Sequence, residues 1–183
     1  MEIKFIVAQS KNRVIGNNNT IPWYVPEDLK RFRDLTLHSI VVMGRKTFES
    51  LPNGPLKNRI NIVITNNPKD VLYENKNKNE TKVIYTNMMN IFSVINYYIN
   101  DYNNANNANN VFIIGGAEIY RLFFIYCKTI YMTLIDEEIE GDILFPIKNE
   151  QLESNFNCIS KSDMLYSSNK NIKYQYLTYE RKK

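Results

Sequence analysis

The sequence predicts a layered α/β domain whose central sheet is largely parallel. Three short apolar runs, at residues 5–8, 40–43 and 111–114, have the unbroken character of buried strands. Each is followed later in the chain by a segment with helix-start signals or with apolar residues at helical spacing. Strands that alternate with helices favour parallel pairing under covering helices. The 183 residues suffice for one well-filled core, so we expect a single domain over 1–183.

The first half of the chain contains the clearest helix start. Turn formers, including Gly16 and Pro22, block a helix before Val25, whereas Pro26 suits a first helical position because its missing N–H would be unpaired there. We therefore expect a helix from Pro26 to about Leu37, after a long loop over residues 9–25. The other elements expected in this half are a strand at 40–43 that ends at Gly44, a short helix at 47–51 and a strand at 59–65.

The second half continues the alternation, with longer polar interruptions. Residues 88–102 carry apolar side chains at helical spacing, and we expect this stripe to be core. Segments 68–82 and 103–110 are polar; the second is nearly all asparagine and is expected to be a disordered surface insertion. The remaining expected elements are strands at 83–85, 111–114 and 130–135, a helix from the Gly115–Gly116 pair towards Tyr126, and an antiparallel hairpin of 156–161 with 173–180.

The composition is that of an ordinary globular protein. Hydrophobic residues make up 44%, aromatic residues 13% and charged residues 23%, and the net charge of +4 is mild. Scattered lysines favour a solvated surface over nucleic-acid binding. Cys127 and Cys158 are far apart and read as reduced thiols of an intracellular protein, and no signal peptide or membrane span is expected. His38 is the sole histidine, which argues against a histidine-rich metal site, so we expect no metal.

Asp28 is the best candidate for an acid. It shares one helix face with Phe32 and Leu35, at positions i, i+4 and i+7. One explanation is structural: a carboxylate in the first helical turn is stabilised by the helix dipole. The alternative is that Asp28, with Phe32 behind it and Trp23 above it, binds a planar, nitrogen-rich ligand in a pocket. Burial there would raise the pKa of the carboxyl group, which is useful in acid catalysis.

Two glycine-containing helix starts suit phosphate binding. Gly44 is followed by Arg45, Lys46 and Thr47, and free N–H groups with two cations favour an anion; a solvated basic helix start remains the alternative. The Gly115–Gly116 pair permits close approach of a ligand to the backbone. Neither matches the nucleoside-triphosphate loop or the usual dinucleotide fingerprint. Both follow predicted strands, and ligands bind at the carboxyl ends of strands in such sheets. We therefore expect these two helix starts and the helix that bears Asp28 to converge on one cleft.

These stretches resemble the dihydrofolate reductase family in order and spacing along nearly the whole chain. The resemblance is carried by VIG at 14–16, IPW at 21–23, PEDL at 26–29, MGRKTFES at 43–50, IGGAEIY at 114–120 and EGDILFP at 140–146. It implies a three-layer α/β fold with a predominantly parallel eight-stranded sheet, an antiparallel C-terminal edge hairpin and about four helices.

The resemblance also implies NADPH-dependent reduction of 7,8-dihydrofolate, with hydride transfer to pterin C6 and protonation at N5. Asp28 would hold the amidine-like edge of the pterin and promote protonation through solvent, and Arg59 would pair with the α-carboxylate of the glutamate tail. The residues expected at the reacting centre are Asp28, Trp23, Ile21, Tyr120 and Thr133. The expected substrate pocket comprises Ile6, Val7, Ala8, Asp28, Leu29, Phe32, Ser50, Leu51, Leu56, Arg59, Ile114, Tyr120 and Thr133.

On the cofactor side, the resemblance implies that Arg45 and Lys46 read the 2′-phosphate of NADPH, together with Thr65 and Asn66. Thr47 and residues 116–118 would face the pyrophosphate. The loop over residues 16–23 would act as a lid. The full expected set is Ala8, Ile15, Gly16, Gly44, Arg45, Lys46, Thr47, Thr65, Asn66, Ile114, Gly115, Gly116, Ala117, Glu118, Ile119 and Tyr120.

Two residues depart from the family pattern. Glu118 is acidic where a basic residue can stand beside the cofactor phosphates, and Ile21 places a β-branched side chain in the lid. Two rival functions remain: the related NADPH-dependent reductase of riboflavin synthesis, against which Trp23, Asp28 and Arg59 argue, and a non-catalytic folate- or NADPH-binding module. The length leaves no room for a fused thymidylate synthase domain, although a chain cut from such a fusion would look the same. We expect a cytoplasmic monomer that binds antifolate-type ligands and serves one-carbon metabolism.

Overall fold

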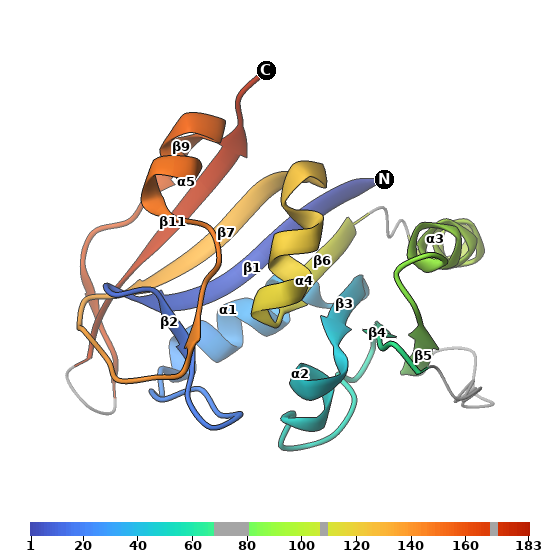
Figure 1. The fold of residues 1–183 in the computed structure, drawn as a ribbon, viewed down its shortest axis with the longest axis horizontal. Helices are drawn as coiled ribbons and strands as arrows, with labels where there is room; N and C mark the ends of the chain where they lie inside the picture. The colour runs from blue at the N-terminus through green and yellow to red at the C-terminus, as the bar shows by residue number, and fades with distance from the viewer. Residues whose placement is uncertain (68–80, 107–109, 169–171) are drawn as a thin grey trace.

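The computed structural model describes residues 1–67, 81–106, 110–168 and 172–183 (Figure 1). Its strands are β1 (Glu2–Ser10), β2 (Val14–Gly16), β3 (Ile40–Gly44), β4 (Ile60–Ile64), β5 (Lys82–Thr86), β6 (Asn110–Gly115), β7 (Cys127–Ile135), β8 (Ile143–Leu144), β9 (Phe156–Lys161), β10 (Leu165–Tyr166) and β11 (Lys173–Arg181). Its helices are α1 (Pro26–Thr36), α2 (Arg45–Glu49), α3 (Ile91–Asn106), α4 (Ala117–Phe123), α5 (Asn149–Asn155) and the 3-10 turn η1 (Phe124–Tyr126).

The main sheet confirms the predicted fold class. Eight strands follow the order β10-β11-β7-β1-β6-β3-β4-β5, and β9 pairs with β11 beside this path. All five pairings from β7 through β1, β6, β3 and β4 to β5 are parallel. The C-terminal strands are antiparallel, as predicted, but both β9 and β10 pair with β11, so the edge is more elaborate than one hairpin.

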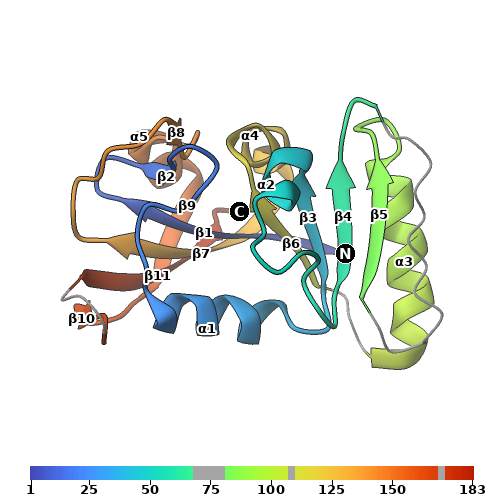
Figure 2. The same ribbon diagram turned by 90° about the horizontal axis from the view of Figure 1, so that it is seen from below.

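Helices cover both faces of the sheet. Figures 1 and 2 show α1 on one face of β1 and β7, with α4 on the opposite face. Side chains alternate along each strand, so Val41 and Met43 face α1 whereas Ile40 and Val42 face the other layer. We call the buried groups the α1-side cluster and the α4-side cluster. The result is the predicted three-layer arrangement.

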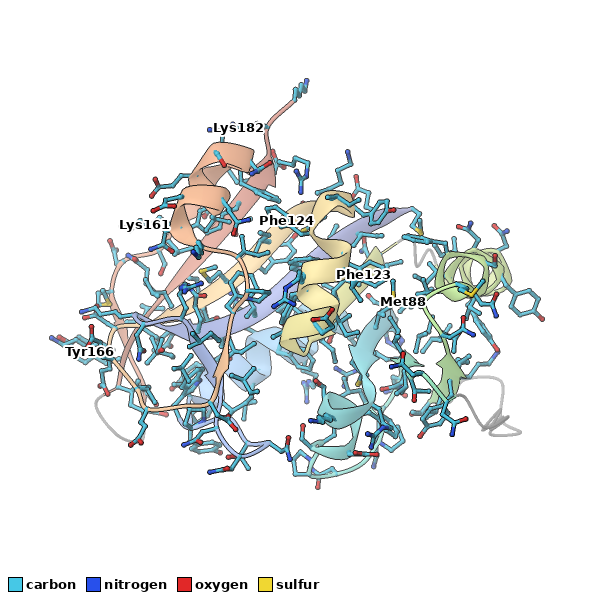
Figure 3. All side chains as sticks on the ribbon, in the orientation of Figure 1. Met88, Phe123, Phe124, Lys161, Tyr166 and Lys182 are labelled. Atoms are coloured by element: carbon cyan, nitrogen blue, oxygen red, sulfur yellow. The ribbon has the colours of Figure 1, made fainter. Side chains whose placement is uncertain are left out.

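The α4-side cluster is the larger core. It joins strands β1, β3, β4 and β6 to helices α3, α4 and α5. Phe123 of α4 is fully buried in it, and Met88, which precedes α3, packs against it (Figure 3). Phe123 also contacts the ring of Phe92 in α3, with 5.8 Å between ring centroids. Aromatic packing of this kind fixes the two helices against each other.

The helix boundaries differ from the sequence predictions in explicable ways. Helix α2 runs from Arg45 to Glu49 rather than over residues 47–51, because Gly44 has an extended backbone and the helix begins at the next residue. It also ends earlier, since Leu51 precedes Pro52 and a residue in that position is disfavoured in a helix. Helix α5 was not predicted: among its side chains only Leu152 is buried, which leaves no apolar periodicity to detect.

The prediction of disorder over residues 103–110 is wrong where the structure describes that segment. Helix α3 continues to Asn106, since extending an existing helix costs far less than starting one. Asn110 belongs to β6, pairs with Glu2 and accepts a hydrogen bond from the Lys4 ammonium at 3.0 Å. Residues 107–109, and residues 68–80 of the other polar segment, lie outside the described residues.

Candidate active site

The carboxyl ends of three neighbouring parallel strands form one edge of the sheet. Strands β1, β6 and β3 are adjacent and parallel, and they end at Ser10, Gly115 and Gly44. Helix α4 begins one residue after β6 ends, and helix α2 begins directly after β3. Gly44 lies close to the start of α4, because a Cβ added to it would lie 3.8 Å from the nitrogen of Gly116. The predicted convergence of the two glycine-containing helix starts is therefore confirmed.

Asp28 faces a buried hydroxyl on the sheet. Pro26 is the first residue of α1, as predicted, which places Asp28 in the first turn. Thr133 of β7 is 1% exposed and donates a hydrogen bond from its Oγ1 to Asp28 Oδ1 at 2.5 Å. Burial raises the pKa of the Asp28 carboxyl group, while the Thr133 hydrogen bond and the charge of Arg31 act in the opposite direction. The site thus holds a carboxyl group that keeps its proton to higher pH than an ordinary aspartate.

A cluster of apolar side chains lies on the α1 face of the sheet. The α1-side cluster contains buried Ile6 with partly buried Phe32, Leu51, Leu56 and Ile114, all five of which were expected in the substrate pocket. They come from strands β1 and β6, from helix α1 and from the loop between α2 and β4. The cluster therefore offers a partly exposed apolar surface at the strand ends.

The expected pocket residues are not all placed alike. Leu29 follows Asp28 on α1 and is 49% exposed. Val7 belongs to the α4-side cluster, so its backbone rather than its side chain is available at this face. Ser50 donates its hydroxyl to the carbonyl of Thr47 at 2.8 Å and closes the end of α2. Ala8 lies opposite Thr133 in the pairing of β1 with β7, so it is on the strand next to the one that bears the hydrogen-bond partner of Asp28.

Tyr120 ties helix α4 to the first strand. Its hydroxyl donates to the carbonyl oxygen of Ile6 at 2.7 Å, inside the protein. Burial raises the pKa of this phenol far above its ordinary value, so it stays protonated. The ring of Tyr120 also contacts Phe5 and Phe145, with 5.2 Å between ring centroids in both cases. Tyr120 thus fixes the strand end on which Ile6 and Ala8 lie.

Arg59 is buried rather than exposed on the surface. It is 6% exposed, and its guanidinium donates from Nη1 to Thr36 Oγ1 at 2.8 Å and from Nε to the carbonyl of Lys57 at 3.0 Å. Its Cζ lies 5.7 Å from the centroid of the Phe32 ring. Among the described residues, no carboxylate lies within ion-pair distance of Arg59. This fixed cation beside the apolar cluster can bind an external carboxylate.

The glycine pair and Thr47 lie against each other. A Cβ added to Gly116 would lie 3.3 Å from Thr47 Oγ1, and one added to Gly115 would lie 3.6 Å from the same atom. Gly115 also has φ +125°, a conformation that side-chain-bearing residues rarely adopt. Ile119 packs on Gly44 from α4, with its Cγ1 3.2 Å from the position of an added Cβ. The absence of side chains on Gly115 and Gly116 thus lets the Thr47 hydroxyl lie close to the start of α4.

The cations expected at the 2′-phosphate lie on the surface. Arg45 and Lys46 are exposed and line a pocket of about 190 Å³ with Asn19, Glu49 and Ser50. Nη1 of Arg45 bonds both carboxylate oxygens of Glu49, at 2.7 and 2.9 Å.

Thr65 and Asn66, the other two residues expected at this phosphate, follow β4 and do not line that pocket. The hydroxyl of Thr65 accepts a hydrogen bond from the Asn67 N–H at 3.3 Å. Ala117 and Glu118 open helix α4, and Glu118 is exposed and pairs with Arg121 at 2.8 Å.

The predicted lid is held by a small sheet that the sequence did not predict. Strand β2 contains Ile15 and Gly16 and pairs with β8. The backbone N–H of Asn18 donates to Asp142 Oδ1 at 3.2 Å. Gly141 permits this packing, since a Cβ there would lie 2.3 Å from Val14 Cγ1. The stretch around Asp142 was among those that carry the family resemblance, which was the available signal for it.

Two lid residues occupy different surroundings. Ile21 is 57% exposed. Trp23 is half-buried and packs in a third cluster with Val25, Ile135 and Tyr174, and not with Phe32 in the α1-side cluster. The lid is therefore anchored at both ends, by β8 on one side and by Trp23 on the other.

A membrane-spanning helix and a metal-binding cluster are both absent from the described ranges. No helix there is both long and apolar enough to cross a membrane. Those residues also contain no group of three or more histidine, cysteine, aspartate or glutamate side chains that could hold a metal ion. Cys127 is buried and Cys158 is exposed, and both are free thiols.

Comparison with known proteins identifies the family. A family model described as dihydrofolate reductase matches residues 2–181. The chain belongs to the dihydrofolate reductase family. The dihydrofolate reductase of Bacillus subtilis (strain 168) is 34% identical over 180 residues, which cover 98% of this chain and 95% of that protein. That of Buchnera aphidicola subsp. Acyrthosiphon pisum (strain APS) is 41% identical over 146 residues, or 80% of each chain.

A solved structure supports the same assignment. The dihydrofolate reductase from Enterococcus faecalis, complexed with NADP(H) and RAB-propyl, aligns with a TM-score of 0.79 and 30% identity. The alignment covers 100% of this chain and 97% of that one. The prediction that the chain is an oxidoreductase of the dihydrofolate reductase type is confirmed. NADPH, the cofactor expected from the sequence, is the reduced form of the dinucleotide bound in the Enterococcus faecalis structure.

Proposed function

We propose that this chain reduces 7,8-dihydrofolate to 5,6,7,8-tetrahydrofolate with NADPH. Family membership supports the reaction. The observation that carries the proposal at the level of the site is the Asp28–Thr133 pair, a carboxyl group of raised pKa beside a partly exposed apolar cluster. This combination suits a flat heterocycle that needs both a hydrogen-bonding anchor and a proton.

Asp28 has two functions in this proposal. Its carboxylate accepts hydrogen bonds from the two adjacent N–H groups of the pterin amidine-like edge, while Thr133 holds the acceptor oxygen in place. Its raised pKa favours proton supply to N5 through solvent. When bound, NADPH supplies the hydride that C6 receives. One hydride at C6 and one proton at N5 saturate the C6–N5 double bond and balance the reaction.

The apolar residues around Asp28 orient the substrate. Ile6, Phe32 and Ile114 contact the same cluster from β1, α1 and β6, so a planar ring placed on it is held by three elements. Tyr120 supports this surface by fixing the Ile6 carbonyl. Orientation of the reactants and exclusion of water contribute much of the rate of such reactions. Good orientation alone lowers the activation barrier by about 7–11 kcal/mol.

Arg59 is proposed to bind the α-carboxylate of the glutamate tail. Its guanidinium is fixed by Thr36 and the Lys57 carbonyl through Nη1 and Nε. No hydrogen bond within the described residues uses its Nη2. The negative charge of a carboxylate beside the guanidinium would counteract the lowering of the Arg59 pKa that burial causes. Such charge-assisted contacts contribute roughly 1.5–3 kcal/mol.

The cofactor side fits a phosphate-bearing dinucleotide. The Thr47 hydroxyl, which lies close to Gly115 and Gly116 at the start of α4, suits the pyrophosphate. Arg45 and Lys46 suit the 2′-phosphate, on condition that Arg45 exchanges Glu49 for the phosphate. The acidic Glu118 is compatible with this arrangement because Arg121 compensates its charge.

The setting of the enzyme completes the proposal. We propose a monomer with a single domain over residues 1–183 that acts in the cytoplasm and needs no nucleic acid. Tetrahydrofolate from this reaction would support one-carbon metabolism, including thymidylate and purine synthesis. Both cysteines are free thiols, which is compatible with a reducing compartment.

The decisive experiment is an absorbance assay at 340 nm. The protein is mixed with NADPH, with and without dihydrofolate, and each reaction is repeated with methotrexate. Decay that requires dihydrofolate and is blocked by methotrexate is the expected result. Absence of decay, with binding of both ligands shown by calorimetry, would favour the non-catalytic binding module. Decay with an opened ribosylaminopyrimidine but not with dihydrofolate would favour the riboflavin-type reductase.

A further inference from the structure

Arg31 lies beside the acid of the proposed site, on the same helix. It follows Asp28 by three residues in α1, a spacing that places two side chains next to each other on a helix surface. Its Nη1 donates to Thr133 Oγ1 at 3.3 Å and to the carbonyl of Met132 at 3.4 Å. The same Thr133 oxygen donates its proton to Asp28. One hydroxyl therefore connects a guanidinium to the carboxyl group.

Aromatic rings fix the guanidinium in this place. Its Cζ lies 4.2 Å from the centroid of the Tyr176 ring on β11 and 5.9 Å from that of Tyr131 on β7. A guanidinium over an aromatic face is held by cation–π attraction. Arg31 is half-buried, which distinguishes it from Arg33, an exposed arginine two positions further along α1. The side chain thus crosses from the helix to two strands.

The phenol groups that interact with Asp28 are neutral at physiological pH. Tyr120 of α4, with Tyr174 and Tyr176 of β11, interact electrostatically with Asp28, and burial raises the pKa of all three phenols. Tyr131 of β7 interacts with Arg31 rather than with Asp28.

Two further ionisable side chains lie near this group. Glu27 adjoins Asp28 in the chain, but its carboxylate accepts a hydrogen bond from the backbone N–H of Ser168. Cys127 interacts with Tyr120, and burial raises the pKa of its thiol to about 12. Arg31 is consequently the charged side chain that acts on Asp28 within the described residues.

We propose that Arg31 is a positioning residue for the reaction: it holds the Thr133 hydroxyl against Asp28, and its charge favours the ionised form of that carboxyl group. This inference rests on the proposed reductase function, because it concerns the acid of the same site. An arginine suits the task because it stays charged and its planar fork can bond Thr133 and Met132 while stacking on Tyr176.

The consequence is a limit on how far burial raises the pKa of Asp28. Burial is the largest influence and raises it, the Thr133 hydrogen bond lowers it, and the Arg31 charge lowers it further. Removal of the Arg31 charge therefore leaves the effect of burial less opposed, and the pKa of Asp28 rises. Weakening of the Thr133 hydrogen bond, which Arg31 holds in place, also raises this pKa. Both effects move the Asp28 titration to higher pH.

The experiment is a titration of the Asp28 carboxyl carbon by NMR, with its signal assigned from its loss in Asp28→Asn. It compares the unaltered protein with Arg31→Met, which removes the charge, and Arg31→Lys, which keeps it without the planar fork. Arg33→Met is the matched control. We expect Arg31→Met to raise the Asp28 midpoint by about one pH unit, at the lower end of what an opposite charge does to a carboxyl group. We expect less than half that shift in Arg31→Lys and none in Arg33→Met.

The kinetic readout is the pH dependence of kcat/KM for dihydrofolate. The fall in activity with rising pH should move upward in Arg31→Met in parallel with the NMR midpoint. An unchanged midpoint in Arg31→Met would overturn the inference, as would equal shifts in Arg31→Met and Arg33→Met. If Arg31→Met does not fold, Arg31→Gln answers the same question.

The two readouts separate this inference from the proposed function. An NMR shift without turnover in the unaltered protein would refute the reductase activity alone. Turnover without an NMR shift would refute the role of Arg31 alone.

Discussion

The two sides of the proposed active site hold their charges in opposite ways. At the acid, Asp28 is held by buried Thr133 on β7. Arg31 is held by the same Thr133 and by the ring of Tyr176 on β11. On the cofactor side, Arg45 is exposed and bonds Glu49 four residues along the same short helix. The first arrangement links three elements of the fold, whereas the second is local to one helix.

This difference shows which side the fold prepares in advance. Contacts between side chains of different elements persist as long as the tertiary structure does, so Asp28 is already placed for its substrate. An exposed ion pair is worth only about 0.2–1 kcal/mol, so Arg45 can exchange Glu49 for a phosphate at little cost. Substitutions should therefore affect chemistry on the first side and affinity on the second.

Asp28→Asn should have the largest effect. The amide cannot supply a proton, so turnover near neutral pH should fall by about 10²-fold or more, the usual scale for loss of acid–base assistance. The fold and NADPH affinity should be retained, since Asp28 lies on the substrate side. Steady-state kinetics with dihydrofolate and fluorescence titration with NADPH measure the two effects. Turnover close to that of the unaltered protein would remove Asp28 from the mechanism.

Arg45→Ala should act on affinity and leave the chemical step unchanged. Loss of a charge-assisted contact with the 2′-phosphate corresponds to roughly 10- to 100-fold weaker NADPH binding. NADH lacks that phosphate and should lose much less. Dissociation constants for both dinucleotides test this, with Arg33→Ala as a control for the general loss of one positive charge from the surface. Equal losses for the two cofactors would show that Arg45 does not read the phosphate.

Glu49→Gln should give the smallest effect and the opposite sign. It removes the competitor of the phosphate for Arg45, so NADPH should bind up to about fivefold more tightly, the value of one exposed ion pair. The gain should vanish in the Arg45→Ala background, which a double-mutant cycle measures. Weaker NADPH binding in Glu49→Gln would instead mean that Glu49 orients Arg45 for the phosphate.

The sequence predicted those parts of the molecule that depend on local signals. Pro26 determines where α1 begins, and unbroken apolar runs marked β1, β3 and β6, so the convergence of their ends could be predicted. Strands β2 and β8 contain three and two residues, which is too short for any periodicity to be detected.

Contacts between elements were the least predictable features of the site. Arg31 is one of several charged residues of α1 in the sequence, and its position becomes informative only when β7 and β11 bring Thr133 and Tyr176 to it. The burial of Arg59 is hidden in the same way, because its partner Thr36 is 23 residues away. Side-chain networks of this kind are set by tertiary packing, which no local pattern encodes.

The most direct test of the account is the pH profile of dihydrofolate reduction in the unaltered protein and in Asp28→Asn, from pH 5 to 9. Because burial raises the pKa of Asp28, its protonated form should persist above the range of ordinary carboxyl groups, near 4, and be lost as the pH rises. Activity of the unaltered protein should therefore fall through that raised pKa, and this fall should be absent in Asp28→Asn. The same midpoint in both proteins would contradict the claim that Asp28 is the acid around which the site is built.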